Sequence, residues 1–212
     1  MYQKIVDEVK SLSEKGFAQW IKPFLSITSG SEDIVLGVRV PKLRALAKKY
    51  KNIKEDDLLK LLSSKYHEIR ALALFIMVLR AKNEPQRMCE IYLSNLQYIN
   101  NWDLIDYTCP HIVAPVADER TLRELADSDY LWANRVAMVS TIYYIKQGDF
   151  ALALEFAEKF MNHSHHLMHK ASGWMLREIG KKDIDVLKNF LKKYSANMPS
   201  VMRSYAKERL NY

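Results

Sequence analysis

A tryptophan and an aspartate, Trp102 and Asp106, are the side chains of this sequence whose spacing best suits chemistry. Residues four apart share one face of a helix, so we expect the indole ring and the carboxylate to lie side by side. A basic residue occupies the corresponding position in the other units of a sequence repeat described below. A carboxylate in such a place repels a polyanion and must bring some other gain. We expect that gain to be the stabilisation of a transient cation.

The basic residues recur at a nearly regular spacing, and each precedes small or apolar residues that allow close helix packing. They are Arg44, Arg70, Arg135, Lys170 and Arg203, with steps of 26, 65, 35 and 33 residues. The step of 65 divides into 32 and 33 if a further unit is centred on Trp102. A period of about 33 to 35 residues with two helices per unit is typical of an α-solenoid.

The elements expected to position these residues are helices. Apolar clusters fall in residues 58–62, 69–79, 151–160 and 186–191, and short polar breaks fall at residues 83–85, 127–129, 147–149 and 180–183. Residues 33–40 are interpreted as an extended loop, and 6 Gly and 6 Pro disfavour an all-β fold. We predict an all-α fold, an α-solenoid of HEAT-like helix pairs in one domain over residues 1–212, curved with a basic concave face. An irregular helical bundle is the alternative.

The charge balance favours a polyanionic partner, because the chain carries a net charge of +7. Equivalent positions in successive repeats line up on one face, so the basic residues could follow a nucleic-acid backbone. The candidate phosphate-contacting residues are Arg44, Arg70, Lys170, Arg177 and Arg203. The alternative is that some of them pair with an Asp or Glu of a neighbouring helix.

Other features restrict the class of protein. Cys89 and Cys109 lack metal-site spacing, which excludes a zinc finger and favours reduced thiols in a cytoplasmic protein. The longest apolar run, residues 71–79, is about half of a membrane span, and the chain begins without an apolar run. We therefore expect no membrane association, no signal peptide and no metal. We also expect no cofactor, and a monomer, because nothing in the sequence argues for an oligomer. Trp20 and Trp132 are interpreted as core residues, and Trp102 and Trp174 as exposed rings.

Four segments resemble the DNA alkylation-repair glycosylases of the AlkD type, which are built from HEAT-like repeats. They are Gly37-Val38-Arg39-Val40-Pro41 with Leu43-Arg44, Trp102-Asp103-Leu104-Ile105-Asp106, Asn134-Arg135-Val136-Ala137, and Lys170-Ala171-Ser172-Gly173-Trp174-Met175-Leu176-Arg177-Glu178. The resemblance covers essentially the whole chain, and the order and separation of the segments match as well. One departure is a longer segment, residues 26–36, before Gly37.

The resemblance implies a catalytic set of Trp102, Asp106, Arg135 and Trp174. It also implies a substrate, double-stranded DNA with cationic N3- or N7-alkylated purines, whose glycosidic bond is already weakened by the charge. Asp106 would stabilise the oxocarbenium-like sugar and hold a water. The two indole rings would flank the sugar, and Arg135 would hold a phosphate.

Three neighbouring features carry alternative interpretations. Asp103 could form an acid–base dyad with Asp106, although a capping or salt-bridged role is expected. Lys170 could attack the sugar as a Schiff-base nucleophile. The histidines at positions 163, 165, 166 and 169 lack an HExxH pattern, so we expect a polar loop contacting phosphate in preference to a metal site.

Two other functions compete with the glycosylase. One is a non-catalytic relative that binds damaged or branched DNA, and the other is a protein-binding HEAT scaffold. Retention of all four residues of the catalytic set favours an enzyme over a binder, and the basic positions disfavour the scaffold.

Overall fold

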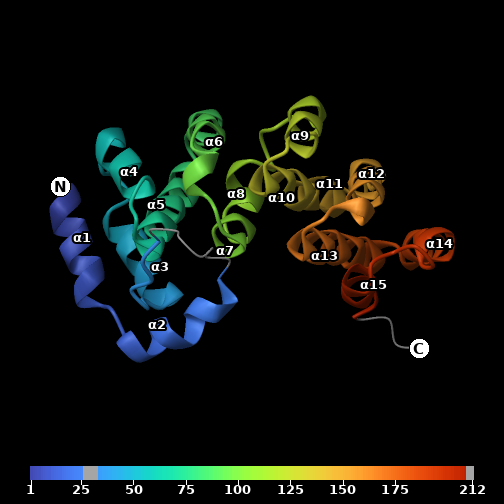
Figure 1. Ribbon diagram of the computed structural model, residues 1–212. Helices are drawn as coiled ribbons and strands as arrows, with labels where there is room; N and C mark the ends of the chain where they lie inside the picture. Colours follow the sequence, from blue (N-terminus) through green and yellow to red (C-terminus); the bar gives the residue numbers. More distant parts are fainter. Residues whose placement is uncertain (26–32, 209–212) are drawn as a thin grey trace. The chain divides into compact units, whose positions relative to one another are not determined.

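The computed structural model describes residues 1–25 and 33–208 (Figure 1). Most of the longer segment noted in the sequence, residues 26–32, lies outside this part. The chain divides into two compact units, Met1–Ile112 and Val113–Tyr212, and each is described by itself. A single domain over residues 1–212 and a curved, basic concave face stay predictions.

The first unit is organised around one buried helix, α5 (His67–Arg80), whose residues from His67 to Met77 are all buried. It packs against α3 (Val40–Lys49) and α4 (Glu55–Leu62). The other elements of this unit are α1 (Tyr2–Ser11), α2 (Lys15–Ile21), the 3-10 helix η1 (Lys22–Phe24), α6 (Pro85–Ser94), the 3-10 helix η2 (Leu96–Tyr98), α7 (Trp102–Asp106) and α8 (Cys109–Ile112).

The second unit has two central helices, α10 (Leu131–Ser140) and α13 (His166–Lys182), which pack against each other. Around them lie α9 (Glu119–Ala126), α11 (Ile142–Gln147), α12 (Ala151–Lys159), the 3-10 helix η3 (Phe160–Asn162), α14 (Ile184–Tyr194) and α15 (Ser200–Lys207). Helix α13, orange in Figure 1, lies along red α15.

Ion pairs between helices recur at a spacing close to the predicted period of about 33 to 35 residues. Within the first unit the Arg87 guanidinium binds Glu55, 32 residues earlier. Within the second unit Arg123 binds Glu155 and Lys159 binds Asp127, in each case again 32 residues away. Residues one period apart therefore touch on adjacent helices, as stacked helix pairs require.

The basic residues of the repeat occupy equivalent places in their helices. Each is the fourth or fifth residue of its helix, for Arg44 in α3, Arg70 in α5, Arg135 in α10, Lys170 in α13 and Arg203 in α15. Asp106 is the fifth residue of α7. In this unit Asp106 therefore occupies the helix position of the basic residues, four residues after the Trp102 on which the sequence centred the repeat.

The predicted breaks fall between helices at residues 83–85, 127–129 and 147–149. The fourth is wrong in part, because α13 continues through Gly180 to Lys182. A Cβ at Gly180 would come within 2.3 Å of the Leu187 side chain, so this glycine allows α13 and α14 to pack closely and does not form a turn. The extended loop is confirmed for residues 33–39, while Val40 begins α3. A bridge joins Ile34 to Tyr66, and the described residues have no other strand pairing.

Within residues 1–25 and 33–208, no helix has the length and apolar character that crossing a membrane requires.

Candidate active site

The short helix α7 carries Trp102 and Asp106 and is held at its start by a buried side chain. Asn101, 1% exposed, caps the helix by accepting a hydrogen bond from the Trp102 amide at 3.0 Å. Five residues cannot form a stable helix alone, because nucleation fixes several residues for very few hydrogen bonds. The position of α7 therefore depends on its contacts with other elements.

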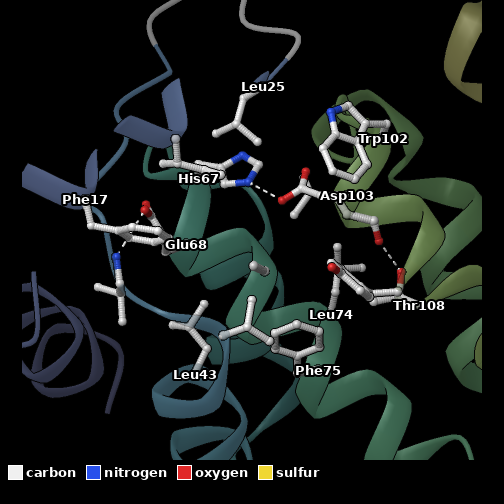
Figure 2. A pocket seen from close by; sticks show the side chains of 16 residues that line it. Phe17, Leu25, Leu43, His67, Glu68, Leu74, Phe75, Trp102, Asp103 and Thr108 are labelled. Atoms are coloured by element: carbon white, nitrogen blue, oxygen red, sulfur yellow. Dashed lines mark hydrogen bonds and ion pairs between the residues drawn. The ribbon is translucent and has the colours of Figure 1, made fainter. Parts of the chain in front are cut away.

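A second tether joins α7 to α5. The His67 Nε2 lies 2.8 Å from Asp103 Oδ2, and Figure 2 shows the His67 ring facing the Asp103 carboxylate. Because the carboxylate can only accept, His67 donates from Nε2. Asp103 is thus paired with His67, which confirms the expected salt-bridged role. This contact gives no support to an acid–base dyad of Asp103 with Asp106.

A third contact fixes the Trp102 ring itself. Its Nε1 donates a hydrogen bond of 2.9 Å to the carbonyl of Phe24, at the end of η1. The ring is partly buried and its orientation is set by a residue 78 positions earlier. Trp102 is therefore not a freely exposed ring but one held between α7 and the N-terminal segment.

Asp106, one turn after Trp102, is also partly buried. It lies close to Tyr92, whose pKa is raised well above its usual value by complete burial, with the charge of Asp106 adding to the shift. Just after the helix, Thr108 donates to the Leu104 carbonyl and contacts the Tyr92 hydroxyl. These contacts anchor the C-terminal end of α7.

The loop before α7 is locked by a buried arginine. Arg70, 2% exposed, donates to Asp33 at 2.8 Å, to the Asn100 side chain at 3.0 Å and to the Ser64 carbonyl at 2.8 Å. Burial raises the pKa of Asp33, but the hydrogen bond and charge of Arg70 outweigh this and leave that pKa lowered. Arg70 makes the pairing with a neighbouring acidic residue that was the alternative to phosphate contact.

A second buried anchor explains the Gly37 motif. The Glu68 carboxylate accepts backbone hydrogen bonds from Leu36, Gly37 and Val38 at 2.8, 2.6 and 3.3 Å. Gly37 has φ +78°, and a Cβ there would lie 2.4 Å from the Glu14 carbonyl oxygen. Glycine is required both by this left-handed conformation and by the close approach of α2.

A small pocket lies beside Trp102 and Asp103. Figure 2 shows Phe17, Leu43, Leu74 and Phe75 along its apolar wall and the His67–Asp103 pair at its polar end. Its cavity volume is about 120 Å³. A cavity of about 150 Å³ admits benzene, so this one is too small for a purine. Asp106 is not among the described residues that line it.

In the second unit, Arg135 and Trp174 each have a partner within the protein. Arg135, 4% exposed, donates to the Leu167 carbonyl at 2.7 Å and so joins α10 to the first turn of α13. Trp174 is partly buried and donates from Nε1 to Glu178 at 3.1 Å. Their catalytic roles stay predictions.

The Asn134 that precedes Arg135 organises the histidine-rich loop. Its Nδ2 donates to the carbonyls of Leu125 and Ser128, and its Oδ1 lies 3.2 Å from His163 Nε2. Burial lowers the pKa of His163 and of His165. Within the described residues, no group of three or more His, Cys, Asp or Glu is placed to hold a metal ion.

The candidate phosphate-contacting residues differ in how far they are available. Arg44 is exposed and lies over the Phe75 ring at 5.5 Å, and Lys170 is partly buried. Arg177 is paired with Glu178 and Glu208, and Arg203 donates to the Ser195 carbonyl. The contacts of all five with DNA stay predictions.

Two features of the site were missed in the sequence. His67 has no motif around it, and only its separation of 36 residues from Asp103, close to the repeat period, could have suggested the pair. The interpretation of Trp20 as a core residue is wrong, because its side chain is 61% exposed. It is the only exposed one among the four tryptophans of the chain, all of which are described.

Comparison with known proteins agrees with this arrangement of helices. A predicted DNA alkylation repair enzyme from Enterococcus faecalis has a similar structure, with a TM-score of 0.69 and 13% identity over 93% of this chain and 96% of that one. AlkD2 from Streptococcus mutans matches with a TM-score of 0.63 and 18% identity over 100% of both chains. The smu.31 protein of Streptococcus mutans UA159 matches with a TM-score of 0.60 and 17% identity over 93% of this chain and 98% of that one.

At these identities the structural likeness shows the fold, which is all-α and of the AlkD type. No protein of curated function matches the sequence. The family described as "DNA alkylation repair enzyme", however, matches residues 5–210, nearly the whole chain. The chain belongs to the DNA alkylation repair enzyme family.

Proposed function

We propose that this protein is a monofunctional DNA glycosylase that releases cationic N3- and N7-alkylated purines from double-stranded DNA. The observation that carries the proposal is the rigid presentation of Trp102 and Asp106 on one face of α7. Asn101, His67 and the Phe24 carbonyl each hold that helix or its ring in place. A site held by three separate tethers is preorganised, and preorganisation is the main source of electrostatic catalysis.

One carboxylate suffices for this substrate. Ordinary glycosidases protonate the leaving group with one carboxyl group and use a second for the other face of the sugar. An alkylated purine is already cationic and leaves without protonation. As the bond from the anomeric carbon to the purine breaks and the base leaves neutral, Asp106 stabilises the positive charge on the deoxyribose. It also orients the water that attacks the anomeric carbon and accepts the proton that this water loses. No cofactor enters this mechanism.

The remaining members of the catalytic set act on the surroundings of the sugar. The Trp102 ring contacts the deoxyribose and attracts the cationic lesion by cation–π interaction, and we propose the same kind of contact with the DNA for the Trp174 ring. Arg135 contacts the neighbouring phosphate. Since Arg135 already donates to the Leu167 carbonyl from one nitrogen, its other nitrogens make the phosphate contact.

The alkylated base does not enter the pocket beside Trp102. That cavity, about 120 Å³, is smaller than a purine needs, and its polar end is occupied by the His67–Asp103 pair. The lesion is therefore held through its sugar and phosphate, without a base-binding pocket. Adducts larger than methyl are tolerated on this account, and inactivity on all of them would contradict it.

The DNA backbone is held by the basic residues whose charge is available. Arg44 and Lys170 have no acidic partner among residues 1–25 and 33–208, and we propose them as the primary phosphate contacts. Arg70, Arg177 and Arg203 are engaged within the protein. The protein acts as a monomer, because one lesion needs one site. It acts in the cytoplasm, on the DNA of the nucleoid.

The direct test is release of N7-methylguanine from duplex DNA, followed by chromatography of the free base. The wild type should release the base and leave the strand intact. No release from N7-methylguanine or N3-methyladenine substrates would overturn the proposal in favour of a non-catalytic DNA binder. Strand cleavage with trapping by borohydride, abolished in Lys170→Ala, would instead assign the step to a Schiff base on Lys170.

A further inference from the structure

Three aromatic side chains of the N-terminal segment form an exposed cluster, Phe17, Trp20 and Phe24, called here the aromatic cluster. The Trp20 side chain is 61% exposed and Phe24 is 59% exposed. Phe17 stacks on Trp20 with ring centroids 5.6 Å apart, and Trp20 lies 5.3 Å from Phe24. Single apolar side chains on a surface need no explanation, whereas large apolar rings that are exposed next to each other indicate an interaction surface.

The charge around the aromatic cluster favours an anionic partner. Residues 15–25 contain two lysines, Lys15 and Lys22, and no acidic residue. The Arg39 guanidinium lies over the Phe17 ring at 4.4 Å, although it is also paired with Glu14 at 3.0 Å. Aromatic faces flanked by cations are the arrangement that binds single-stranded nucleic acid, with bases on the rings and phosphates on the charges.

The aromatic cluster is continuous with the candidate active site. The Phe24 carbonyl accepts the hydrogen bond from Trp102 Nε1, and Phe17 lines the pocket on whose rim Trp102 lies. Both connections lie within the first unit. A strand held at Trp102 and Asp106 would therefore run close to the exposed faces of Trp20 and Phe24.

We propose that the aromatic cluster is a stacking platform for DNA bases that are unpaired next to the lesion. This inference rests on the proposed function, which places the lesion at Asp106. After base release the base opposite the lesion has no pairing partner. Every base has a π-face, so Trp20 and Phe24 can stack on whichever base is exposed, while Lys15 and Lys22 bind the flanking phosphates.

The test compares DNA that differs only in exposed bases. Binding of a fully paired duplex and of the same duplex with a two-base bulge is measured by fluorescence anisotropy at several salt concentrations. The wild type should prefer the bulged DNA. Trp20→Ala should weaken binding of the bulged DNA about tenfold and of the paired duplex less than about twofold, without changing the salt slope. Lys22→Ala should instead lower the salt slope by about 0.9 for both.

The matched control is Tyr143→Ala, which removes an exposed aromatic ring of the second unit, 39% exposed, outside the aromatic cluster. It should leave the preference for the bulge unchanged. Trp20 is mostly in solvent, so its loss should leave the urea unfolding midpoint unchanged, and a folded Trp20→Ala protein that keeps the wild-type preference overturns the inference.

Two further arms separate the alternatives. Binding to anionic phospholipid vesicles that is lost in Trp20→Ala, with DNA binding unchanged, would assign the aromatic cluster to a membrane surface and overturn the inference. Base release measured on the same proteins separates this inference from the proposed function. Loss of bulge preference in Trp20→Ala without any base release by the wild type supports the platform and refutes the glycosylase. Normal base release with an unchanged preference refutes the platform alone.

Discussion

His67 Nε2 lies 2.8 Å from Asp103 Oδ2, and this contact joins the buried helix α5 to the short helix α7 that presents Trp102 and Asp106. The two residues are 36 positions apart, about one repeat. The His67 side chain is 4% exposed and the Asp103 side chain 20% exposed, so water cannot fully replace either partner. The geometry of the candidate active site therefore depends on a contact between repeats.

Removal of His67 should destabilise the first unit. In His67→Leu the Asp103 carboxylate loses its donor while still mostly buried, which costs about 1–3 kcal/mol. Urea unfolding measures this loss. The double variant His67→Leu/Asp103→Leu should recover part of it, because no polar group is then left unpaired.

The surface pair Arg120–Glu124 provides the control for this prediction. Both side chains are largely in solvent, and Arg120→Ala should change the free energy of unfolding by less than about 1 kcal/mol. Equal effects of His67→Leu and Arg120→Ala would show that the contact between α5 and α7 contributes no particular stability.

The buried pair of Arg70 and Asp33 should make stability depend on pH. The pKa of Asp33 is lowered in the folded protein, so its contribution is present above the unfolded value of about 3.9 and is lost as the pH falls through the folded value. Urea unfolding between pH 7 and pH 3 should show a smaller loss of stability on acidification in Asp33→Asn than in the wild type. Identical pH dependence in the two proteins would contradict the assignment.

Gly173, directly before Trp174, should tolerate no larger residue. A Cβ there would lie 2.5 Å from the Met202 carbonyl oxygen and 2.6 Å from the Tyr205 Cβ, so α15 would have to move away from α13. We expect Gly173→Ala to destabilise the protein by about 1–3 kcal/mol in a thermal or urea unfolding experiment.

Gly16 is the matched control, since it lies in α2 and a Cβ there would meet nothing within 4 Å. Gly16→Ala should leave stability unchanged or raise it by up to about 1 kcal/mol, because alanine favours the helix. If Gly173→Ala were as well tolerated as Gly16→Ala, the close packing of α13 on α15 would be refuted.

Trp102→Phe tests the hydrogen bond to Phe24 separately from the ring. Phenylalanine keeps an aromatic face but has no N–H donor, so the ring loses the contact that orients it. We expect base release to slow about fivefold, the equivalent of about 1 kcal/mol, and Trp102→Ala to slow it further. Single-turnover release of N7-methylguanine measures both. A Trp102→Phe rate equal to that of the wild type would show that the hydrogen bond to Phe24 does not contribute to base release.

The helices and the approximate repeat period could be predicted because they depend on local apolar periodicity that recurs along the chain. The sequence centred the irregular repeat on Trp102, whereas Asp106 occupies the helix position of the basic residues. Contacts between repeats could not be predicted. The exposure of Trp20 depends on which elements cover α2, and tryptophan is on average well buried, so composition favoured the wrong answer. Gly180 was mistaken for a helix break because its need for close packing arises from Leu187 of another helix.

The sequence also could not predict which basic side chains are available to bind phosphate. Sequence register grouped Arg44, Arg70, Arg135, Lys170 and Arg203 as equivalent, and their helix positions agree. Their environments differ, because Arg70 and Arg135 are buried and bonded within the protein while Arg44 is exposed. Which basic residue is free to meet a phosphate is decided by acceptors far from it in the sequence or in the loops around it.

The central claim is that Asp106 is the catalytic carboxylate, and single-turnover release of N7-methylguanine by Asp106→Asn tests it most directly. Asparagine keeps the size of the side chain and removes its charge. The account predicts that release slows by at least about 100-fold while binding of unmodified duplex DNA does not weaken. Release by Asp106→Asn at the wild-type rate would contradict it.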